Sequence, residues 1–180
     1  MTELDTKYPT IIFNDLPLID PSIIENLIDK KKQQKRYYSN YYYKDKDRDM
    51  NVLFIRDVAS NFLSLKQINH YKEINHYKEI WYMDCIRYEL ENDLKGVESG
   101  LAWHCENDNF PNLITVLLYL RKDEGVKNGN LRYKNKNNKK CTIEINTGTT
   151  IIMDGNVPHK PENPCGTGIR DLIIVSFHKI

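Results

Sequence analysis

The sequence predicts a two-sheet jelly roll, a mostly β fold, with helices packed on one of its sheets. Its second half consists of short apolar or alternating segments separated by turn signals, a pattern typical of β-sandwiches and barrels. Its first half contains segments with helical periodicity, and helices that precede a set of strands can cover one face of the sheet. The length of 180 residues suits a single domain, with a helical support region at 1–84 and a jelly-roll core at 85–180.

In the first half, one helix is expected to begin at Ser22, because Glu25 three positions later completes a capping box. Cations are favourable at a helix C-terminus, so this helix is expected to continue into the lysine-rich residues 30–36. A second helix is expected from Ser60 onward. Strands are expected at Thr10–Phe13, Tyr37–Tyr43 and Met50–Ile55.

In the second half, the expected strands are short and closely spaced. Leu113–Leu120 is continuously apolar, which indicates burial on both faces of a sheet. The mouth of such a barrel is a natural ligand pocket. The other expected strands are Cys85–Leu90, Leu101–Glu106, Cys141–Ile145, Thr149–Met153 and the apolar run Ile169–Phe177.

Composition and charge exclude several classes of protein. The net charge is +1 and the isoelectric point is near 7.6, so no global field favours nucleic acid or a membrane surface. The four cysteines have neither the spacing of a zinc module nor the density of a disulfide scaffold, which predicts free thiols in a reduced, intracellular compartment. No apolar run approaches the roughly 20 residues of a membrane span, and no signal peptide opens the chain, so a soluble cytoplasmic protein is expected.

The most informative motif is His104-Cys-Glu106, read together with His159 and Arg170. On a strand, side chains two positions apart point to the same face, so His104 and Glu106 are expected to bind one ion. With His159 as a third ligand, two histidines and one carboxylate leave coordination positions open, as in non-haem Fe(II) oxygenases. Arg170 lies in an apolar run, where a charge is costly unless it is paired, and a guanidinium can bind a carboxylate with two hydrogen bonds.

This set of residues resembles the iron-binding and co-substrate-binding signature of the Fe(II)/2-oxoglutarate-dependent dioxygenases. The sequence between the motifs is similar to the prolyl-4-hydroxylase-like branch of that family, at Leu117–Leu120, Asn128–Tyr133 and Gly148–Met153. The resemblance covers about half of the chain, from Ile86 to Phe177. It implies a double-stranded β-helix, the cupin-like form of the jelly roll.

The resemblance also implies a role for each residue. His104, Glu106 and His159 would bind Fe(II), although the family usually has Asp at the second position. Asp108 is the alternative carboxylate. The resemblance further implies that 2-oxoglutarate binds the metal at one end while Arg170 and the hydroxyl of Tyr119 bind its far carboxylate. Turnover would then consume O2 and release succinate and CO2, with ascorbate as an optional reductant.

Residues around these motifs are expected to have supporting roles. Thr115 and Leu117 share a strand face with Tyr119 and are expected to line the pocket, or to serve as plain core residues. Arg121 stands where the family pattern has Asn. Trp103 is next to a ligand in sequence, and its expected role is core packing.

The resemblance suggests hydroxylation of a protein or peptide side chain, most simply proline, with segment 37–43 or 123–128 closing over the peptide. A second interpretation is oxidative demethylation of nucleic acid. That branch carries a second arginine six positions after the first, whereas this chain has Ser176 there. A third is a non-catalytic jelly-roll binding module. The heavy use of Asn, Lys, Ile and Tyr is typical of an AT-rich coding genome, such as that of a large DNA virus; the sequence specifies no oligomeric state.

Overall fold

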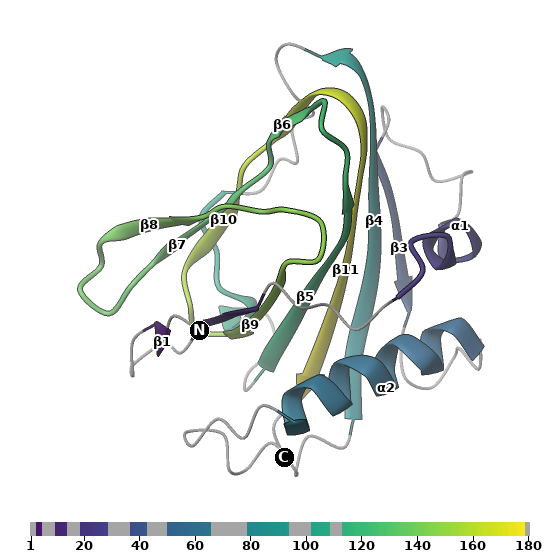
Figure 1. Cartoon of the computed structure of the whole chain (residues 1–180). Helices are drawn as coiled ribbons and strands as arrows, with labels where there is room; N and C mark the ends of the chain where they lie inside the picture. The colour runs from purple at the N-terminus through teal and green to yellow at the C-terminus, as the bar shows by residue number, and fades with distance from the viewer. Residues whose placement is uncertain are drawn as a thin grey trace.

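The computed structural model describes residues 3–4, 10–13, 19–28, 37–42, 50–65, 79–93, 102–108 and 113–178. Most of these residues form two facing β-sheets, and two helices lie against the larger sheet (Figure 1). The predicted jelly roll with packing helices is therefore confirmed. Within the described residues, no helix combines the length and the apolar character that crossing a membrane requires.

The main sheet has eight strands, seven of which lie in the order β1-β2-β9-β5-β11-β4-β3, while β6 pairs with one end of β11. The neighbouring strands are antiparallel throughout. Strands from the first 84 residues thus extend the same sheet as those from the second half. The strands are β1 (Glu3–Leu4), β2 (Thr10–Phe13), β3 (Tyr37–Tyr42), β4 (Glu79–Asp93), β5 (Leu113–Lys122), β6 (Val126–Asn128), β9 (Thr150–Asp154) and β11 (Pro164–His178).

The small sheet has three antiparallel strands in the order β10-β7-β8. They are β7 (Leu131–Lys134), β8 (Lys140–Ile143) and β10 (His159–Pro161). Leu117, Ile151 and Leu172 of the main sheet pack with Leu131 and Ile143 of the small sheet. We call this group between the two sheets the inner cluster, and the candidate site lies on the same side of the main sheet.

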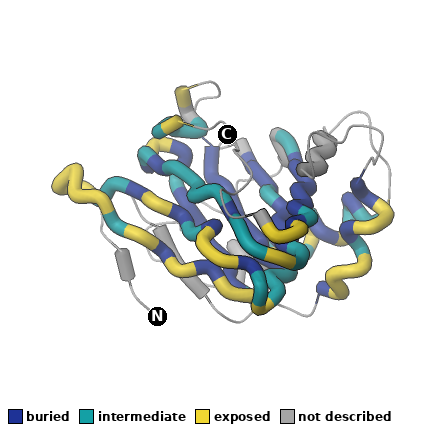
Figure 2. Tube along the Cα trace, turned by 90° about the horizontal axis from the view of Figure 1, so that it is seen from above, coloured by how far each residue is buried: buried dark blue, intermediate teal, exposed yellow. Residues whose placement is uncertain are grey.

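The opposite face of the main sheet packs against the helices. Ile24 and Leu27 of α1 (Ile23–Leu27) and Ile55 of α2 (Met50–Leu65) contact a cluster that includes Val116 and Ile173. Because β5 contributes alternate residues to both clusters, its first eight residues are all buried, as its continuous apolar sequence predicted. Figure 2 shows this burial as dark blue along the central strands.

The strand expected at Met50–Ile55 is wrong, since these residues form the first turns of α2. The buried positions Val52, Ile55 and Ala59 are spaced by three and four residues, which is the helical period. Phe54 and Met50 remain exposed on the other side of the helix. The helix expected from Ser60 is confirmed as far as Leu65, and its continuation lies outside the described residues.

Helix α1 is shorter than expected, because Ile28 already has an extended backbone at ψ 121°. The capping box is also wrong: Ser22 has helical dihedral angles and its side chain makes no capping hydrogen bond. Asp20 takes that role instead, since its carboxylate accepts a hydrogen bond from the backbone N–H of Ser22 at 2.9 Å. Residues 29–36 and Tyr43 lie outside the described residues.

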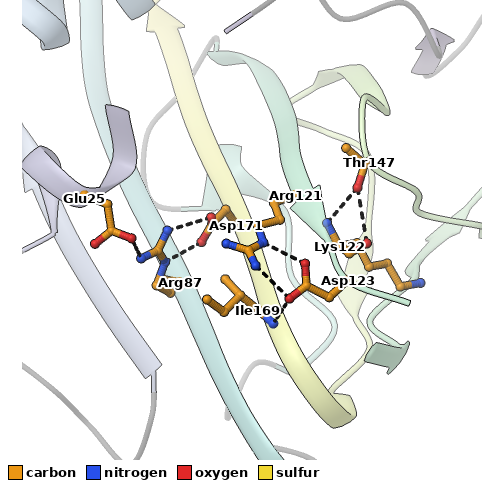
Figure 3. Close-up of polar contacts among 8 residues, drawn as sticks. All are labelled: Glu25, Arg87, Arg121, Lys122, Asp123, Thr147, Ile169 and Asp171. Atoms are coloured by element: carbon orange, nitrogen blue, oxygen red, sulfur yellow. Dashed lines mark hydrogen bonds and ion pairs between the residues drawn. The ribbon is translucent and has the colours of Figure 1, made fainter. Parts of the chain in front are cut away.

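A buried ion pair joins two strands beneath helix α1. Arg87 of β4 donates to both carboxylate oxygens of Asp171 on β11, at 2.8 and 2.9 Å, and also contacts Glu25 of α1 (Figure 3). The side chains of Arg87 and Asp171 are 4% and 0% exposed. Asp171 directly follows Arg170, so this pair fixes β11 against β4 next to the candidate anion site.

Asp171→Asn is expected to destabilise the fold by about 3 kcal/mol, because it removes the buried counter-charge of Arg87 and leaves only the half-exposed Glu25 beside it. For a chain of this size the melting temperature should fall by roughly 6–12 °C. Thermal denaturation followed by circular dichroism measures this change. The double variant Arg87→Met/Asp171→Leu is the control, since replacing both charges by apolar groups should restore most of the stability. A single variant as stable as the wild type would contradict the prediction.

Candidate metal centre and anion site

His104 and His159 are brought together by the backbone. They form an isolated antiparallel bridge in which the N–H of His104 donates to the carbonyl of His159 at 3.1 Å and the reverse bond is 2.9 Å. His159 also begins β10, where it pairs with Tyr133 of β7. The small sheet therefore holds both imidazoles at the edge of the inner cluster.

The strand expected at Leu101–Glu106 is wrong for its described residues, Ala102–Glu106, although the two motif residues still lie together. Only His104 bridges, and Glu106 begins a short 3-10 turn, η4 (Glu106–Asp108). The carboxylate of Asp108 accepts a hydrogen bond from the N–H of Cys105 at 3.0 Å, and this local bond competes with strand pairing. Asp108, the alternative carboxylate, thus stabilises the turn and is exposed.

The three ligand-bearing side chains converge. Oε1 of Glu106 is 3.6 Å from Nε2 of His159 and 3.9 Å from Nε2 of His104. The imidazole centroids are 4.3 Å apart, and the three ligand atoms all lie within 4.8 Å of one another. These residues are separated by up to 55 positions in the sequence but form one compact cluster.

The backbone orients both imidazoles for binding through Nε2. Nδ1 of His104 is 2.9 Å from the carbonyl of Ala102, and Nδ1 of His159 is 2.9 Å from the carbonyl of Val157. A carbonyl only accepts, so each Nδ1 carries a proton, and each ring turns its Nε2 toward Glu106 as the atom that could bind a metal. Ligating histidines in metal sites are commonly held by the same kind of second hydrogen bond.

Glu106 is held from its other side by a tyrosine. The hydroxyl of Tyr82 on β4 donates to Oε2 of Glu106 at 2.8 Å. Burial alone would raise the pKa of Glu106, but the hydrogen bond and charge of His159, the bond from Tyr82 and the charge of His104 together lower it. Burial and the charge of Glu106 raise the pKa of Tyr82, so the phenol keeps its proton at neutral pH.

The cluster fits a first-row divalent metal. Two imidazole nitrogens and one carboxylate oxygen are the donor set of non-haem iron sites with open positions. Two ligands about 2.1 Å from one ion and at right angles to it lie about 3 Å apart, so the two separations between the carboxylate and the imidazoles need to close by less than about 1 Å. The ligand atoms of all three residues lie within 4.8 Å of one another.

Arg170 is a candidate for a second site, on the inner face. Its side chain is 2% exposed and lies between the rings of Tyr88 and Tyr119, with centroid distances of 5.4 and 5.0 Å. One terminal nitrogen donates to the carbonyl of Gly129 at 2.9 Å, whereas the buried Nε has no hydrogen-bond partner. Among the described residues Arg170 has no acidic partner, so it is a buried cation with one N–H, at Nε, that lacks a hydrogen-bond partner. This arrangement fits a carboxylate ligand.

The other predicted pocket residues are all on the inner face, with different contacts. Tyr119 is buried against Arg170; burial raises the pKa of its phenol, and the charge and hydrogen bond of Arg170 oppose that shift. Leu117 packs in the inner cluster. Thr115 is fully buried and hydrogen-bonds with Ser176 at 3.0 Å.

Arg121, which stands where the family pattern has Asn, pairs with Asp123 at 2.7 Å, close to the Arg87–Asp171 pair (Figure 3). The core-packing role expected of Trp103 is wrong, because this residue is only half-buried. Its ring lies within 5.3 and 5.9 Å of the ammonium groups of Lys134 and Lys140.

Sequence reasoning missed Tyr82, Tyr88 and Gly129. Strand β4 begins at Glu79, six residues before the strand that the sequence predicted, and the alternation Tyr82-Asp84-Ile86-Tyr88 would have placed both tyrosines on one face. Gly129 has φ +73°, and a Cβ there would lie 3.1 Å from Nε of Arg170. That contact depends on tertiary structure and leaves no signal in one sequence.

Comparisons with known proteins support the fold. No family model and no curated protein matches the sequence. Among solved structures, a 2OG-Fe(II) oxygenase family oxidoreductase from Burkholderia pseudomallei aligns with 95% of this chain and 84% of its own, at 9% identity and a TM-score of 0.61. A prolyl hydroxylase from Trichoplax adhaerens, in complex with a hypoxia inducible factor peptide fragment, aligns over 94% and 83% at 15% identity and a TM-score of 0.61.

A viral collagen prolyl hydroxylase from Paramecium Bursaria Chlorella virus-1, in a 2OG complex, aligns over 96% of both chains at 16% identity and a TM-score of 0.54. At these identities the likeness concerns architecture. This chain therefore has the jelly-roll fold of the 2OG-Fe(II) oxygenases and prolyl hydroxylases.

Proposed function

We propose that the protein is an Fe(II)- and 2-oxoglutarate-dependent dioxygenase that hydroxylates a protein or peptide side chain, with proline as the first candidate. The observation that carries the proposal is the convergence of His104, Glu106 and His159 on the same inner side of the fold as the buried Arg170. A structural core has no need of two oriented imidazoles around a carboxylate, or of a buried guanidinium with an unpartnered Nε.

The chain's own residues would hold the reactants. Nε2 of His104 and of His159 and Oε1 of Glu106 bind the metal, while Arg170 and the hydroxyl of Tyr119 bind the far carboxylate of 2-oxoglutarate. With O2, the bound iron and co-substrate supply an oxidative decarboxylation that yields succinate and CO2 and converts a substrate C–H into C–OH. The apolar inner cluster excludes water from the co-substrate. Ascorbate would serve only to return iron to the ferrous state.

A peptide substrate is supported by one of the structural neighbours, which is a prolyl hydroxylase in complex with a peptide fragment. The two segments expected to close over the peptide are largely paired strands in this structure. Tyr37–Tyr42 forms β3 at an edge of the main sheet, and Val126–Asn128 forms β6 beside β11. A peptide would therefore meet preformed strands at these positions.

The nucleic-acid interpretation has less support. Ser176, at the position where that branch carries a second arginine, is fully buried and hydrogen-bonded with Thr115. An arginine at this position would displace that buried pair. The protein also has no strong net positive charge to attract a phosphate backbone.

The test is turnover with Fe(II), 2-oxoglutarate and a panel of proline-containing peptides, alongside alkylated oligonucleotides. Succinate release that depends on a peptide, with mass spectrometry detecting one added oxygen atom on that peptide, is the expected result. Oxygen transfer only to the oligonucleotides would favour demethylation. Absence of both succinate release and Fe(II) binding would favour the non-catalytic module.

Gly129→Ala should weaken 2-oxoglutarate binding about 10-fold, because the new Cβ would press on the side chain of Arg170. The half-saturating concentration of 2-oxoglutarate in the succinate assay measures this effect. Gly148→Ala is a matched control, since Gly148 also has a positive φ of 86° and its substitution carries a similar backbone strain of about 1–2 kcal/mol. Equal half-saturating concentrations in the two variants would contradict the prediction.

A further inference from the structure

A row of hydroxyl groups crosses the inner face of the main sheet and ends at Glu106. Tyr82 on β4, Ser176 on β11 and Thr115 on β5 are cross-strand partners in adjacent strands. Thr115 and Ser176 share a hydrogen bond of 3.0 Å, Tyr82 lies opposite Ser176 in the strand register, and the hydroxyl of Tyr82 donates to Glu106. The register of the three central strands therefore sets where the phenol lies.

This row is rigid at the end that is remote from Glu106. Thr115 and Ser176 are both fully buried, and a buried hydroxyl without a partner costs about 1–3 kcal/mol. Thr115 and Ser176 are hydrogen-bond partners of each other, so rotation of either side chain would leave the other unsatisfied. Tyr82 lies opposite Ser176 in the strand register, so this fixed pair limits where its phenol can lie.

The two oxygens of Glu106 are in different environments. Oε2 accepts the hydrogen bond from Tyr82 at 2.8 Å, whereas Oε1 faces the imidazole nitrogens of His159 and His104. A glutamate has one more rotatable bond than an aspartate and loses more conformational entropy when it is fixed. The hydrogen bond from Tyr82 to Oε2 already restricts the side chain of Glu106, so less conformational entropy is lost when the metal binds.

From this asymmetry we infer that Tyr82 is a positioning residue for the metal: it holds Oε2 so that Glu106 binds through Oε1 alone. This inference rests on the proposed metal site. If Glu106 binds the metal through one oxygen, it occupies a single coordination position. The remaining positions are then open to a co-substrate that binds the metal through two atoms. The hydrogen bond from Tyr82 also explains how a glutamate serves at this position, since its longer side chain spans from the η4 turn to both the phenol and the histidines.

The test is Mn(II) binding followed by electron paramagnetic resonance, which needs neither co-substrate nor turnover. Tyr82→Phe should bind Mn(II) about 10-fold or more weakly than the wild type, as for other groups that orient metal ligands. Thr150→Val is the control, because it removes another fully buried hydroxyl, one that has no hydrogen-bond partner, and it should change the affinity less than 2-fold.

A double-mutant cycle separates positioning from a general effect on folding. In Glu106→Asp the shorter carboxylate does not reach both the phenol and the histidines, so adding Tyr82→Phe should change the Mn(II) affinity less than 2-fold. An equal loss in both backgrounds would overturn the inference, as would equal affinity of Tyr82→Phe and wild type. If the wild type bound no Mn(II), the proposed function itself would fail and the positioning role with it.

Discussion

Arg170→Met should raise the half-saturating concentration of 2-oxoglutarate about 1000-fold in the succinate assay. The wild-type guanidinium is buried between Tyr88 and Tyr119, so its hydrogen bonds to a carboxylate form away from water. Removing one partner of such a charge pair costs about 4 kcal/mol, and each 1.4 kcal/mol is a factor of ten. Methionine keeps an apolar side chain of similar length between the two rings. The loss of 2-oxoglutarate affinity therefore measures the effect of removing the charge.

The same variant should fold at least as stably as the wild type in the absence of 2-oxoglutarate. The buried Nε has no hydrogen-bond partner, and its removal relieves a cost that the contacts with the two tyrosine rings only partly offset. Addition of 2-oxoglutarate with Mn(II) should raise the melting temperature of the wild type and leave that of Arg170→Met close to its value with Mn(II) alone.

Arg132→Met is the matched control for this substitution. Arg132 is an exposed arginine in a 2.6 Å ion pair with Glu162, and surface pairs contribute only about 0–1 kcal/mol. Its half-saturating concentration should stay within 2-fold of the wild type. A value for Arg170→Met within 3-fold of the wild type would refute the assigned co-substrate contact.

Much of the fold follows from local patterns in the sequence. The continuous apolar segment of β5 predicted a strand buried on both faces, because each face of the main sheet has its own core. The segment Met50–Ile55 was wrongly predicted as a strand, because over six residues its apolar positions fit both a strand and a helix. Only the sixteen-residue helix, with Ala59 continuing the buried stripe, resolves that ambiguity.

In the candidate site, too, some residues could be predicted from the sequence and others could not. His104, Glu106, His159 and Arg170 were found from residue type and order, and their convergence is a property of the strand pairing. The groups that orient them depend on register between distant segments: Tyr82 reaches Glu106 across 24 positions, and the Gly129 carbonyl reaches Arg170 across 41. One sequence does not specify such a register.

Glu106→Gln should reduce Mn(II) affinity by two to three orders of magnitude and bring succinate release below detection. The amide keeps the shape of the side chain, so the hydrogen bond from Tyr82 can persist, but the charge that binds the metal is gone. A neutral amide oxygen is a weaker ligand than a carboxylate, and the two imidazoles alone give an incomplete donor set. Titration with Mn(II) under anaerobic conditions measures the affinity directly.

Asp108→Asn tests whether the neighbouring carboxylate has the same role. Asp108 is exposed and its Oδ2 accepts from the N–H of Cys105, a bond that the amide oxygen of asparagine can keep. Its Mn(II) affinity should therefore remain within 3-fold of the wild type. Because each variant removes one negative charge from the same 3-10 turn, the contrast between them isolates metal ligation. A larger loss in Asp108→Asn than in Glu106→Gln would reassign the third ligand to Asp108.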